Sequence, residues 1–539
     1  MTDIEDPTSE PEKPEDTGRK PASKNPLYVL ATLYGEGDDF GTHIENRLAW
    51  NAWACQNLTP TEKKEITRKI NRDIFKDVVE WSSIKEDVVR RFKERLPEAS
   101  FPRPDDGIEF IWSPREPSPT SFDGFIFPNF ADFCHINFAK YTSFNSAIFL
   151  YRVDFESANF NSYAKFSNTL FMGGVVFMNA NFDSSLTFRS SVFCEYASFR
   201  DVKFKGSASF IGAKFLSSVD FRNAHFQALT NFTSYTHFSH TVFAGEVNFD
   251  EAIFDTSASF RSSVFCESAS FRDSVFKRPI NFTDARFEPS VDFRNADFQA
   301  PTNFMDANFI TYPNFVGAVL HSKTLVTASD KFWPDRGWLK SFIQKFDWRR
   351  SKTLREAGVR MLLSRDEIEK SPKRLAKEDA VHEANPVDAP ESIALSCANL
   401  RHNMAAQGLP DEAHFFFRRE MWARALTAAW YERWLYRIYD WVFSFGHSLI
   451  KPIAWLGLLW LVCAGLFATS GSLEHGKWAL LSFANTFSFF GFHKIFFADP
   501  ETLGGLSGEL QFLIGAQIIL SFILLFFLGL ALRNRFRLT

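Results

Sequence analysis

Cysteine and histidine are the residues of this chain best suited to chemistry, and two of them are adjacent, at Cys134 and His135. A thiol beside an imidazole is the arrangement of a nucleophile and its base. Neighbouring residues of an extended strand point to opposite sides, however, so this pair is poorly placed to cooperate. Three further histidines, His225, His237 and His240, are of a type that ligates metals. Because they occupy outward or corner positions of the local sequence pattern, we expect exposed polar residues instead.

Motifs typical of enzymes are missing from the sequence. It has neither G-x-x-x-x-G-K-[ST] nor G-x-G-x-x-G, and neither G-x-S-x-G nor H-E-x-x-H. The 6 cysteines are scattered without a C-x-x-C pair, which argues against a disulfide framework and a zinc cluster and favours a reducing compartment. We therefore predict a protein that is not an enzyme, with no catalytic residues, no metal ligands and no cofactor.

The middle of the chain carries a regular pattern of phenylalanines. From Phe127 to Phe315 a Phe recurs at alternating steps of five and six residues, which gives 35 consecutive positions among the 64 Phe of the chain. Such a repeat indicates a solenoid with one continuous core. The predicted core ladder includes Phe160, Phe182, Phe188, Phe193, Phe199, Phe204, Phe210, Phe215, Phe221, Phe226, Phe260, Phe271, Phe293 and Phe298.

A small residue lies two positions before each Phe, for example Ala158 before Phe160 and Val219 before Phe221. On a helix, a step of five to six residues would spread the Phe around the whole surface, whereas residues two apart on a strand share a face. Short extended segments joined by corners fit the pattern. The small residue and the Phe then point inward, and the mostly polar residues between them point outward.

The pattern resembles the pentapeptide-repeat family, whose units read Ala-Asp/Asn-Leu/Phe-x-x. The direct matches are Ala158-Asn159-Phe160, Ala180-Asn181-Phe182, Ala296-Asp297-Phe298 and Ala307-Asn308-Phe309. The resemblance covers residues 122–320 and implies a mainly β fold, a right-handed quadrilateral β-helix with flanking helical segments. The extra residue in alternate units departs from the family pattern and predicts uneven corners. With four Phe to a coil, we expect about nine coils in a rod of ~40 Å.

A block of the repeat occurs twice. Segments 188–201 and 219–232 return with few changes as segments 260–273 and 291–304. Since the offset of both pairs is six elevens plus six, the period must slip once. The slip is located by three Phe that are spaced six and six, namely Phe226, Phe232 and Phe238. We therefore expect a bulge or a loosened corner at 233–237.

The ends of a solenoid need covers, because a terminal coil exposes unpaired strand edges. Residues 27–100 have a helical pattern, which includes an N-cap at Thr59 and apolar spacing that continues to Val78, and we expect them to cap the N-terminal end. Residues 332–364 are Trp-rich and basic and predict a helical C-cap. The acidic, Pro-rich residues 1–25 predict a disordered tail.

A charged linker at 365–390 leads into a predicted helical hairpin at 391–447, with a turn at 407–411. The second arm mixes Arg with Trp and Tyr directly before an apolar segment, which is typical of a helix at a membrane surface. A helix packed on its neighbour with a solvated basic face explains the same residues, so both interpretations stay open.

Two segments near the C-terminus, 451–470 and 509–532, are predicted transmembrane helices. Lys451 and several arginines precede the first segment, and three arginines between 533 and 537 follow the second. By the positive-inside rule, both ends of this pair are cytoplasmic. We expect an integral protein of the inner or plasma membrane, with the solenoid and the C-terminus in the cytoplasm.

Residues 478–497, between the two spans, are apolar but include His493 and Lys494. They form either a re-entrant or an interfacial helix. The order span, half-helix, span is also that of two-span potassium-channel pores, whose filter resembles Thr-Val-Gly-Tyr-Gly. Here the candidate filter reads Ser488-Phe489-Phe490-Gly491-Phe492, which matches in one glycine. A plain anchor hairpin is therefore the preferred interpretation.

These observations predict a membrane-anchored member of the family that acts as a non-catalytic scaffold and binds an unknown protein partner on the β-helix surface. The alternative is a pore-loop channel or mechanosensor, which requires a homo-oligomer. Some members of the family imitate DNA with a strongly acidic rod. Residues 122–320 instead hold 19 acidic and 15 basic side chains, so we expect no nucleic acid partner and no imitation of DNA.

Overall fold

The computed structural model of the chain describes residues 22–35, 40–70, 75–106, 108–109, 121–227, 235–334, 389–443, 445, 448–470, 476–496 and 507–535. The chain divides into two compact units, Met1–Ser392 and Ile393–Thr539. Most of the predicted tail at 1–25, the predicted C-cap beyond residue 334, and the predicted linker up to residue 388 lie outside the described residues. The two units are considered separately below.

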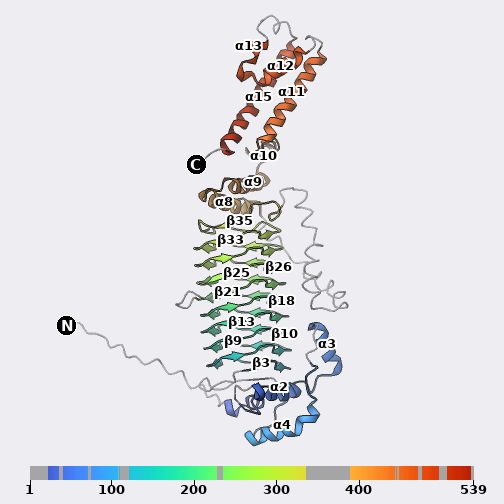
Figure 1. The fold of residues 1–539 in the computed structure, drawn as a ribbon, viewed down its shortest axis with the longest axis vertical. Coiled ribbons are helices and arrows are strands. Elements are labelled where there is room, and N and C mark those ends of the chain that lie inside the picture. The colour runs from blue at the N-terminus through green and yellow to red at the C-terminus, as the bar shows by residue number, and fades with distance from the viewer. Residues whose placement is uncertain are drawn as a thin grey trace, which may run out of the picture. The chain divides into compact units, whose positions relative to one another are not determined.

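The first unit contains a solenoid with four parallel sheets, which we call faces A to D (Figure 1). Face A consists of β1 (Ile108–Glu109), β3 (Ala131–Asp132), β7 (Val153–Asp154), β11 (Val175–Val176), β15 (Ala197–Ser198), β19 (Val219–Asp220), β23 (Val247–Asn248), β27 (Ala269–Ser270) and β31 (Val291–Asp292). Face B consists of β5 (Thr142–Ser143), β9 (Ala164–Lys165), β13 (Leu186–Thr187), β17 (Ala208–Ser209), β21 (Tyr235–His237), β25 (Ser257–Ser259), β29 (Ile280–Asn281), β33 (Thr302–Phe304) and β35 (Leu325–Val326).

The other two faces complete each coil. Face C consists of β2 (Ile126–Phe127), β6 (Ile148–Phe149), β10 (Leu170–Phe171), β14 (Val192–Phe193), β18 (Lys214–Phe215), β22 (Val242–Phe243), β26 (Val264–Phe265), β30 (Arg286–Phe287) and β34 (Asn308–Phe309). Face D consists of β4 (Asn137–Phe138), β8 (Asn159–Phe160), β12 (Asn181–Phe182), β16 (Lys203–Phe204), β20 (His225–Phe226), β24 (Ile253–Phe254), β28 (Val275–Phe276) and β32 (Asp297–Phe298). The chain visits the faces in the order A, D, B, C, and the predicted β-solenoid of about nine coils is confirmed.

One coil is longer than the others. A typical coil consists of four repeat units, so that Phe171 pairs with Phe193. The step between β17 and β21 is longer by one repeat unit, because Ala208 pairs with Thr236. The insertion lies between β20 and β21 and includes 228–234, which are outside the described residues. The expected irregularity at 233–237 is wrong for Tyr235–His237, which form the regular strand β21.

Strand pairing also corrects the list of phenylalanines that belong to the core repeat. Phe226 and Phe238 lie on successive faces, D and B, whereas the pattern counted one further position between them at Phe232, which is outside the described residues. A position that the pattern missed is Phe122, whose ring stacks on Phe144 at 4.9 Å. The six-residue step around Phe232 is therefore an insertion between two repeats.

The interior is filled by stacked phenylalanine rings. All fourteen predicted core positions are buried, with no more than 1 % of any side chain exposed. Phe221, for example, lies parallel to Phe199 at 4.8 Å and to Phe249 at 4.7 Å in neighbouring coils. It also meets Phe210 from face B edge-to-face at 5.6 Å. Both arrangements are favourable for aromatic pairs, so each ring supports several others.

Two kinds of corner explain the alternating steps of five and six. At the short corners, the residue two positions after the Phe has a positive φ, for example His135 at 58° and Asn223 at 55°. Most of these positions hold Ser, Asn, Asp or His, which tolerate this conformation better than bulky residues do. The turn is closed where Phe133 O accepts a bond from Ile136 N. The predicted uneven corners are thus confirmed.

Helices cover the first coil. They are α1 (Pro26–Ala31), α2 (Phe40–Ala54), α3 (Pro60–Ile70) and α4 (Trp81–Arg95), with the short turns η1 (Ala22–Lys24) and η2 (Pro104–Asp106). From α2, Trp50 Nε1 donates to Ile126 O at 2.8 Å. The Asn51 amide donates to Gly124 O and accepts from Ile126 N. Side chains thus satisfy backbone groups that the next coil would otherwise pair.

The segment around α3 packs against the outside of face C. Thr59 and Glu62 exchange the bonds of a capping box, so the predicted N-cap is confirmed. The prediction of a helix that continues to Val78 is wrong, because α3 ends at Ile70 and the chain from Phe75 to Val78 is not helical. Val78 instead joins an apolar cluster with Ile148 on face C.

The solenoid continues a little beyond the predicted boundary at residue 320. Strand β35 adds to face B, and Phe309 N donates to Phe332 O at 2.8 Å. Trp333 is buried against Phe309, with ring centroids 5.0 Å apart. Phe332 and Trp333 therefore cover the end of the face C stack.

The second unit is helical. It contains α8 (Pro390–Ala406), α9 (Pro410–Thr427), α10 (Trp430–Phe443), α11 (Ile450–Thr469), α12 (Lys477–Thr486), η6 (Ser488–Phe490), α13 (Phe492–Phe496) and α15 (Gly508–Arg535). The predicted turn between α8 and α9 is confirmed, with Gly408 at a φ of 72°. The second arm, predicted as one helix, is two helices, because Ala428 adopts an extended conformation with ψ 156°.

Candidate functional site

Cys134 and His135 do not form a reactive pair. Burial and a hydrogen bond to Asp132 raise the pKa of the Cys134 thiol well above its ordinary value, so the thiolate is disfavoured. His135 is the exposed corner residue with positive φ. Cys134 therefore lacks the electropositive surroundings that activate a nucleophile.

The three candidate histidines are separated by the fold. His225 lies on face D, where Nε2 is 2.8 Å from Asp255 Oδ2 and Nδ1 is 3.0 Å from Gln227 Nε2. His237 lies on face B beside Tyr235, and burial lowers its pKa, which favours the neutral ring. His240 is at an exposed corner. Among the described residues, no group of three His, Cys, Asp or Glu is placed to hold a metal ion.

Acidic residues on the solenoid surface are matched by arginines. On face A, Asp220 Oδ2 lies 2.6 Å from Arg222 Nη2, and the equivalent pair one duplicated block later, Asp292 and Arg294, has the same distance. The Asp side chains are largely buried in these pairs, while the Arg side chains are partly exposed. The pairs reduce the negative charge that a face imitating DNA would need.

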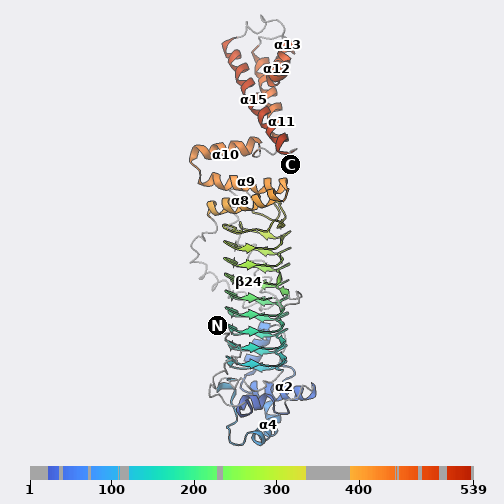
Figure 2. The same ribbon diagram turned by 90° about the vertical axis from the view of Figure 1, so that its left-hand side faces the viewer.

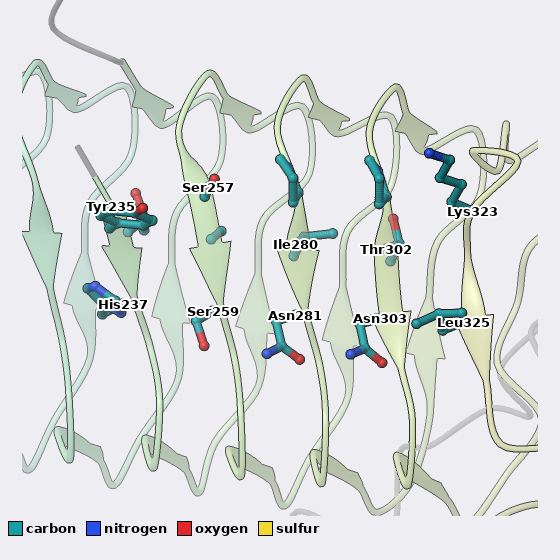
Figure 3. Close-up of a pocket in the computed structure, with 14 residues that line it drawn as sticks. Tyr235, His237, Ser257, Ser259, Ile280, Asn281, Thr302, Asn303, Lys323 and Leu325 are labelled. Carbon is teal, nitrogen blue, oxygen red and sulfur yellow. The ribbon is translucent and has the colours of Figure 1, made fainter. Parts of the chain in front are cut away.

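Face B carries a trough of about 500 Å³ across β21, β25, β29, β33 and β35 (Figure 3). Five strands at the spacing of ~4.8 Å give it a length of ~19 Å. Large side chains close the two ends, Tyr235 with His237 at one and Lys323 with Leu325 at the other. The outward residues between them are small or short, namely Ser257, Ser259, Pro279, Asn281, Pro301 and Asn303.

Asn281 and Asn303 give the trough a row of amide groups. Each carbonyl oxygen accepts a bond from the backbone two residues on, from Thr283 N at 2.8 Å and from Met305 N at 2.9 Å. Within the described part of the chain, neither Nδ2 group has a partner, and Lys323 Nζ forms no ion pair. The trough therefore offers two hydrogen-bond donors and one positive charge to a bound group.

The second unit contains two helices, α11 and α15, that are long and apolar enough to cross a membrane. Only 28% and 11% of their apolar windows are buried in the structure, so most of their surface is available to lipid or to another protein. This exposure differs from that of a core helix in a soluble protein. The two predicted apolar segments are thus confirmed as helices whose length and composition would allow them to cross a membrane.

The short helix α12 lies between α11 and α15 (Figure 1). Trp460, ten residues into α11, donates from Nε1 to Ala479 O at 3.2 Å, and its own carbonyl accepts from Ser482 Oγ at 2.8 Å. Ten residues correspond to ~15 Å along the helix, about half of the length of α11. Ser482 of α12 therefore lies beside the middle of α11.

Four polar residues, which we call the polar clamp, hold α12 against α15: Ser482, Asn485, Thr486 and Gln517. Gln517 Nε2 donates to Ser482 O at 2.9 Å and lies 3.0 Å from Thr486 Oγ1. Asn485 Nδ2 donates to Gln517 Oε1 at 3.0 Å. All four side chains are at most 1 % exposed. In an apolar medium these bonds are needed, because unpaired polar groups there are costly.

Sequence reasoning missed both the trough and the polar clamp. Gln517 is an amide inside the predicted span at 509–532, and an intramembrane polar residue is a signal of function. Its partners lie 31 to 35 residues earlier, at a spacing without a recognisable period. The trough could have been found by aligning the outward residues of successive coils.

Comparison with known families identifies the solenoid. A family model described as pentapeptide repeats (9 copies) matches residues 166–214, 188–234 and 238–286. Searches of curated proteins and of solved structures find no match. The matched segments cover the middle coils of the four-faced stack, in which each side holds one Phe per coil. The solenoid of this chain is therefore a pentapeptide-repeat domain.

Proposed function

We propose that this protein is a membrane-anchored, non-catalytic scaffold whose solenoid binds a partner protein. The observation that carries the proposal is the trough on face B. The core is filled by Phe rings and the pentapeptide-repeat fold is typical of structural and interaction modules, so the outer surface is the part available for function. The trough is a concave part of the described surface, with donors at Asn281 and Asn303.

The partner segment is an extended peptide that carries carbonyl or carboxylate oxygens. Such oxygens accept bonds from the Asn281 and Asn303 amides, and an acidic residue would complement Lys323 at the end of the trough. The aromatic pair Tyr235 and His237 would contact an apolar side chain at the other end. The length of ~19 Å matches about six residues of extended chain.

The anchor is the pair α11 and α15, and the proposed location is the inner or plasma membrane. Basic residues before α11 and after α15 support a cytoplasmic location for the solenoid and the C-terminus. The Arg–Asp pairs of face A support a role without nucleic acid. The raised pKa of the Cys134 thiol supports a role without catalysis.

Site-specific photocrosslinking in membranes tests the scaffold. A benzophenone amino acid replaces Asn281 in the trough or, as a control, the exposed Asn159 on face D. We expect a discrete protein adduct at 281 that disappears when Ser259→Trp fills the trough, and no such adduct at 159. Equal adducts at both positions, or an adduct that is insensitive to Ser259→Trp, would overturn the proposal. Retained protease resistance would show that Ser259→Trp still folds.

A pore-loop channel is the second candidate, and the position of α12 is the observation that favours it. α12 enters between the two spans to about half of their length, and its C-terminal end carries the negative end of the helix dipole, which favours cations. The adjoining Phe489 and Phe490 are exposed. One hairpin cannot enclose a pore, so this function requires a homo-oligomer.

Two measurements separate the candidates. A channel predicts an oligomer in detergent and conductance in a planar bilayer, with conductance lost on deletion of 478–496. A scaffold predicts trough-dependent crosslinking with no conductance. A monomer without conductance would exclude the channel, and conductance without trough-dependent adducts would exclude the scaffold.

A further inference from the structure

Helix α10 exposes an apolar, aromatic side. Half or more of the surface is exposed for Trp430, Trp434, Leu435, Ile438 and Trp441. Most of these residues are three or four positions apart and share one side of the helix, while Glu432 and Arg433 lie toward the other. A contiguous patch of this kind on a protein surface marks a site of interaction.

Contacts at its C-terminal end fix α10 against both apolar helices. The Trp441 ring lies 4.4 Å from that of Trp455 on α11, and the Phe443 ring lies 3.9 Å from that of Phe527 on α15. Lys451 Nζ, in the first turn of α11, donates to Asp440 O at 2.9 Å. The C-terminal turn of α10 is therefore level with the start of α11 (Figure 2).

These contacts also fix how far α10 lies from Arg533, at the charged C-terminal end of α15. Phe527 precedes Arg533, the first charge at the end of α15, by six residues, which is ~9 Å along the helix. Helices that lie in a membrane interface bury their apolar face by about 5–10 Å. If Arg533 is at the headgroups, the apolar side of α10 is at the boundary between headgroups and acyl chains.

The opposite side of α10 is tied to protein. Arg433 Nη2 donates to the carbonyl oxygens of Leu426 and Ala428, at the C-terminal end of α9, at 3.3 Å each. Arg437 lies at the edge of the aromatic side, with its guanidinium 5.6 Å from the Trp434 ring. The break after α9 thus allows α10 to turn its Arg side toward α9 and its Trp side away from it.

We propose that the Trp430–Trp441 side of α10 lies in the lipid headgroup region of the bilayer that holds α11 and α15. The proposal rests on the membrane anchoring described under the proposed function. Lipid is the occupant because the patch is continuous with the apolar surface of the hairpin, and because Trp and Tyr favour the membrane–water interface. It resolves the two interpretations of this arm in favour of the interfacial one.

Lipid photocrosslinking of the full chain in phosphatidylcholine vesicles tests this position. A benzophenone amino acid replaces Leu435 or Ile438 on the apolar side, Arg433 on the opposite side of the same helix, or Phe522 on the exposed side of α15. We expect a lipid adduct, detected by its mass increment, at 435, 438 and 522 but not at 433.

The outcomes separate the two proposals. Lipid adducts at 522 but not at 435 or 438 would overturn the position of α10 and leave the anchor intact. Adducts at neither helix would overturn both. A protein adduct at 435 from a second copy, or equal lipid labelling at 433 and 435, would also contradict the inference. Ile438 guards against a local effect of the Leu435 substitution.

Discussion

The solenoid and the apolar hairpin, which consists of α11, α12 and α15, place their polar and apolar groups in opposite ways. In the solenoid, Phe221 and its neighbours fill the interior, and Asp, Asn, Ser and Arg cover the outside. In the hairpin, Gln517 and the other clamp residues are inside, while Phe512 and Phe522 are outside with 80% and 62% of their surface exposed. The difference teaches that the two parts of one chain suit different surroundings, because the coils expose polar groups, as proteins in water do, while α11 and α15 expose an apolar surface that suits lipid.

The largest expected effect comes from removing an interior ring of the solenoid. Phe221→Ala should lower the free energy of unfolding by ~3–5 kcal/mol, because the cavity lies between stacked and edge-to-face rings and cannot collapse. Urea titration of the full chain in detergent, followed by proteolysis of the solenoid, measures the change. Arg222→Ala, at the neighbouring exposed position, should cost about 1 kcal/mol or less. Equal losses for both variants would contradict the assigned interior.

The matching change in the hairpin removes a polar group. Gln517→Leu leaves Ser482, Asn485 and Thr486 without their shared partner and should destabilise α12 by about 1–3 kcal/mol. In the solenoid the costly change removes an apolar ring, whereas here it removes a polar group even though leucine is the more apolar residue. Protease sensitivity of the segment between α11 and α15, in detergent, provides the measurement. Phe522→Leu on the outer side is the control, and an equal response from it would refute the clamp.

A smaller effect is expected at the short corners of the coil. Asn223 has a φ of 55°, which a β-branched side chain adopts only with strain, so Asn223→Val should cost ~1–2 kcal/mol. Asn223→Gly should be nearly neutral, since glycine accepts positive φ freely. Thermal unfolding of both variants would show the difference. A valine variant as stable as the glycine variant would mean that the corner conformation is not needed.

The smallest effect concerns pH. Burial alone would raise the pKa of Asp255, but bonds from Lys277 at 2.9 Å and from His225 outweigh it and hold the pKa below its ordinary value. This stability is present above the ordinary Asp pKa of about 3.9 and is lost as pH falls through the depressed folded-state value. Asp255→Asn should therefore lose less stability than the native chain between about pH 6 and about pH 3.

The hairpin provides a contrast to that titration, because the clamp consists of amides and hydroxyls that do not titrate in this range. Asp284→Asn, at an exposed corner, is the control for Asp255. If it removed as much of the acid sensitivity as Asp255→Asn does, the network of Asp255 would not be its source.

Much of the solenoid could be predicted because its signal is local and repeated. A Phe every five or six residues identifies the inside of every coil from neighbours in sequence alone. The same regularity concealed the insertion, since a six-residue insertion beside Phe232 has the length of one repeat unit. Only strand pairing, which places Phe226 and Phe238 on successive faces, distinguishes this insertion from a further repeat unit.

The candidate sites were harder to predict because they depend on distant residues. The trough combines side chains from five coils, and the clamp joins Gln517 to a helix that lies far from it in the sequence. The break between α9 and α10 at Ala428 is not marked by a Gly or a Pro in the sequence. The two long apolar helices, in contrast, were predicted closely. The sequence predicted 451–470 and 509–532, and the structure has Ile450–Thr469 and Gly508–Arg535. The agreement is good because length and apolarity are properties of a single segment.

Alkaline carbonate extraction of membranes from expressing cells tests the central claim, that one part of the chain is built for lipid and the other for water. The full chain should remain in the membrane pellet, and a chain that ends at residue 449, which keeps the solenoid and α10 but lacks α11 and α15, should be released in folded, protease-resistant form. Release of the full chain would contradict the account, as would retention of the truncated one.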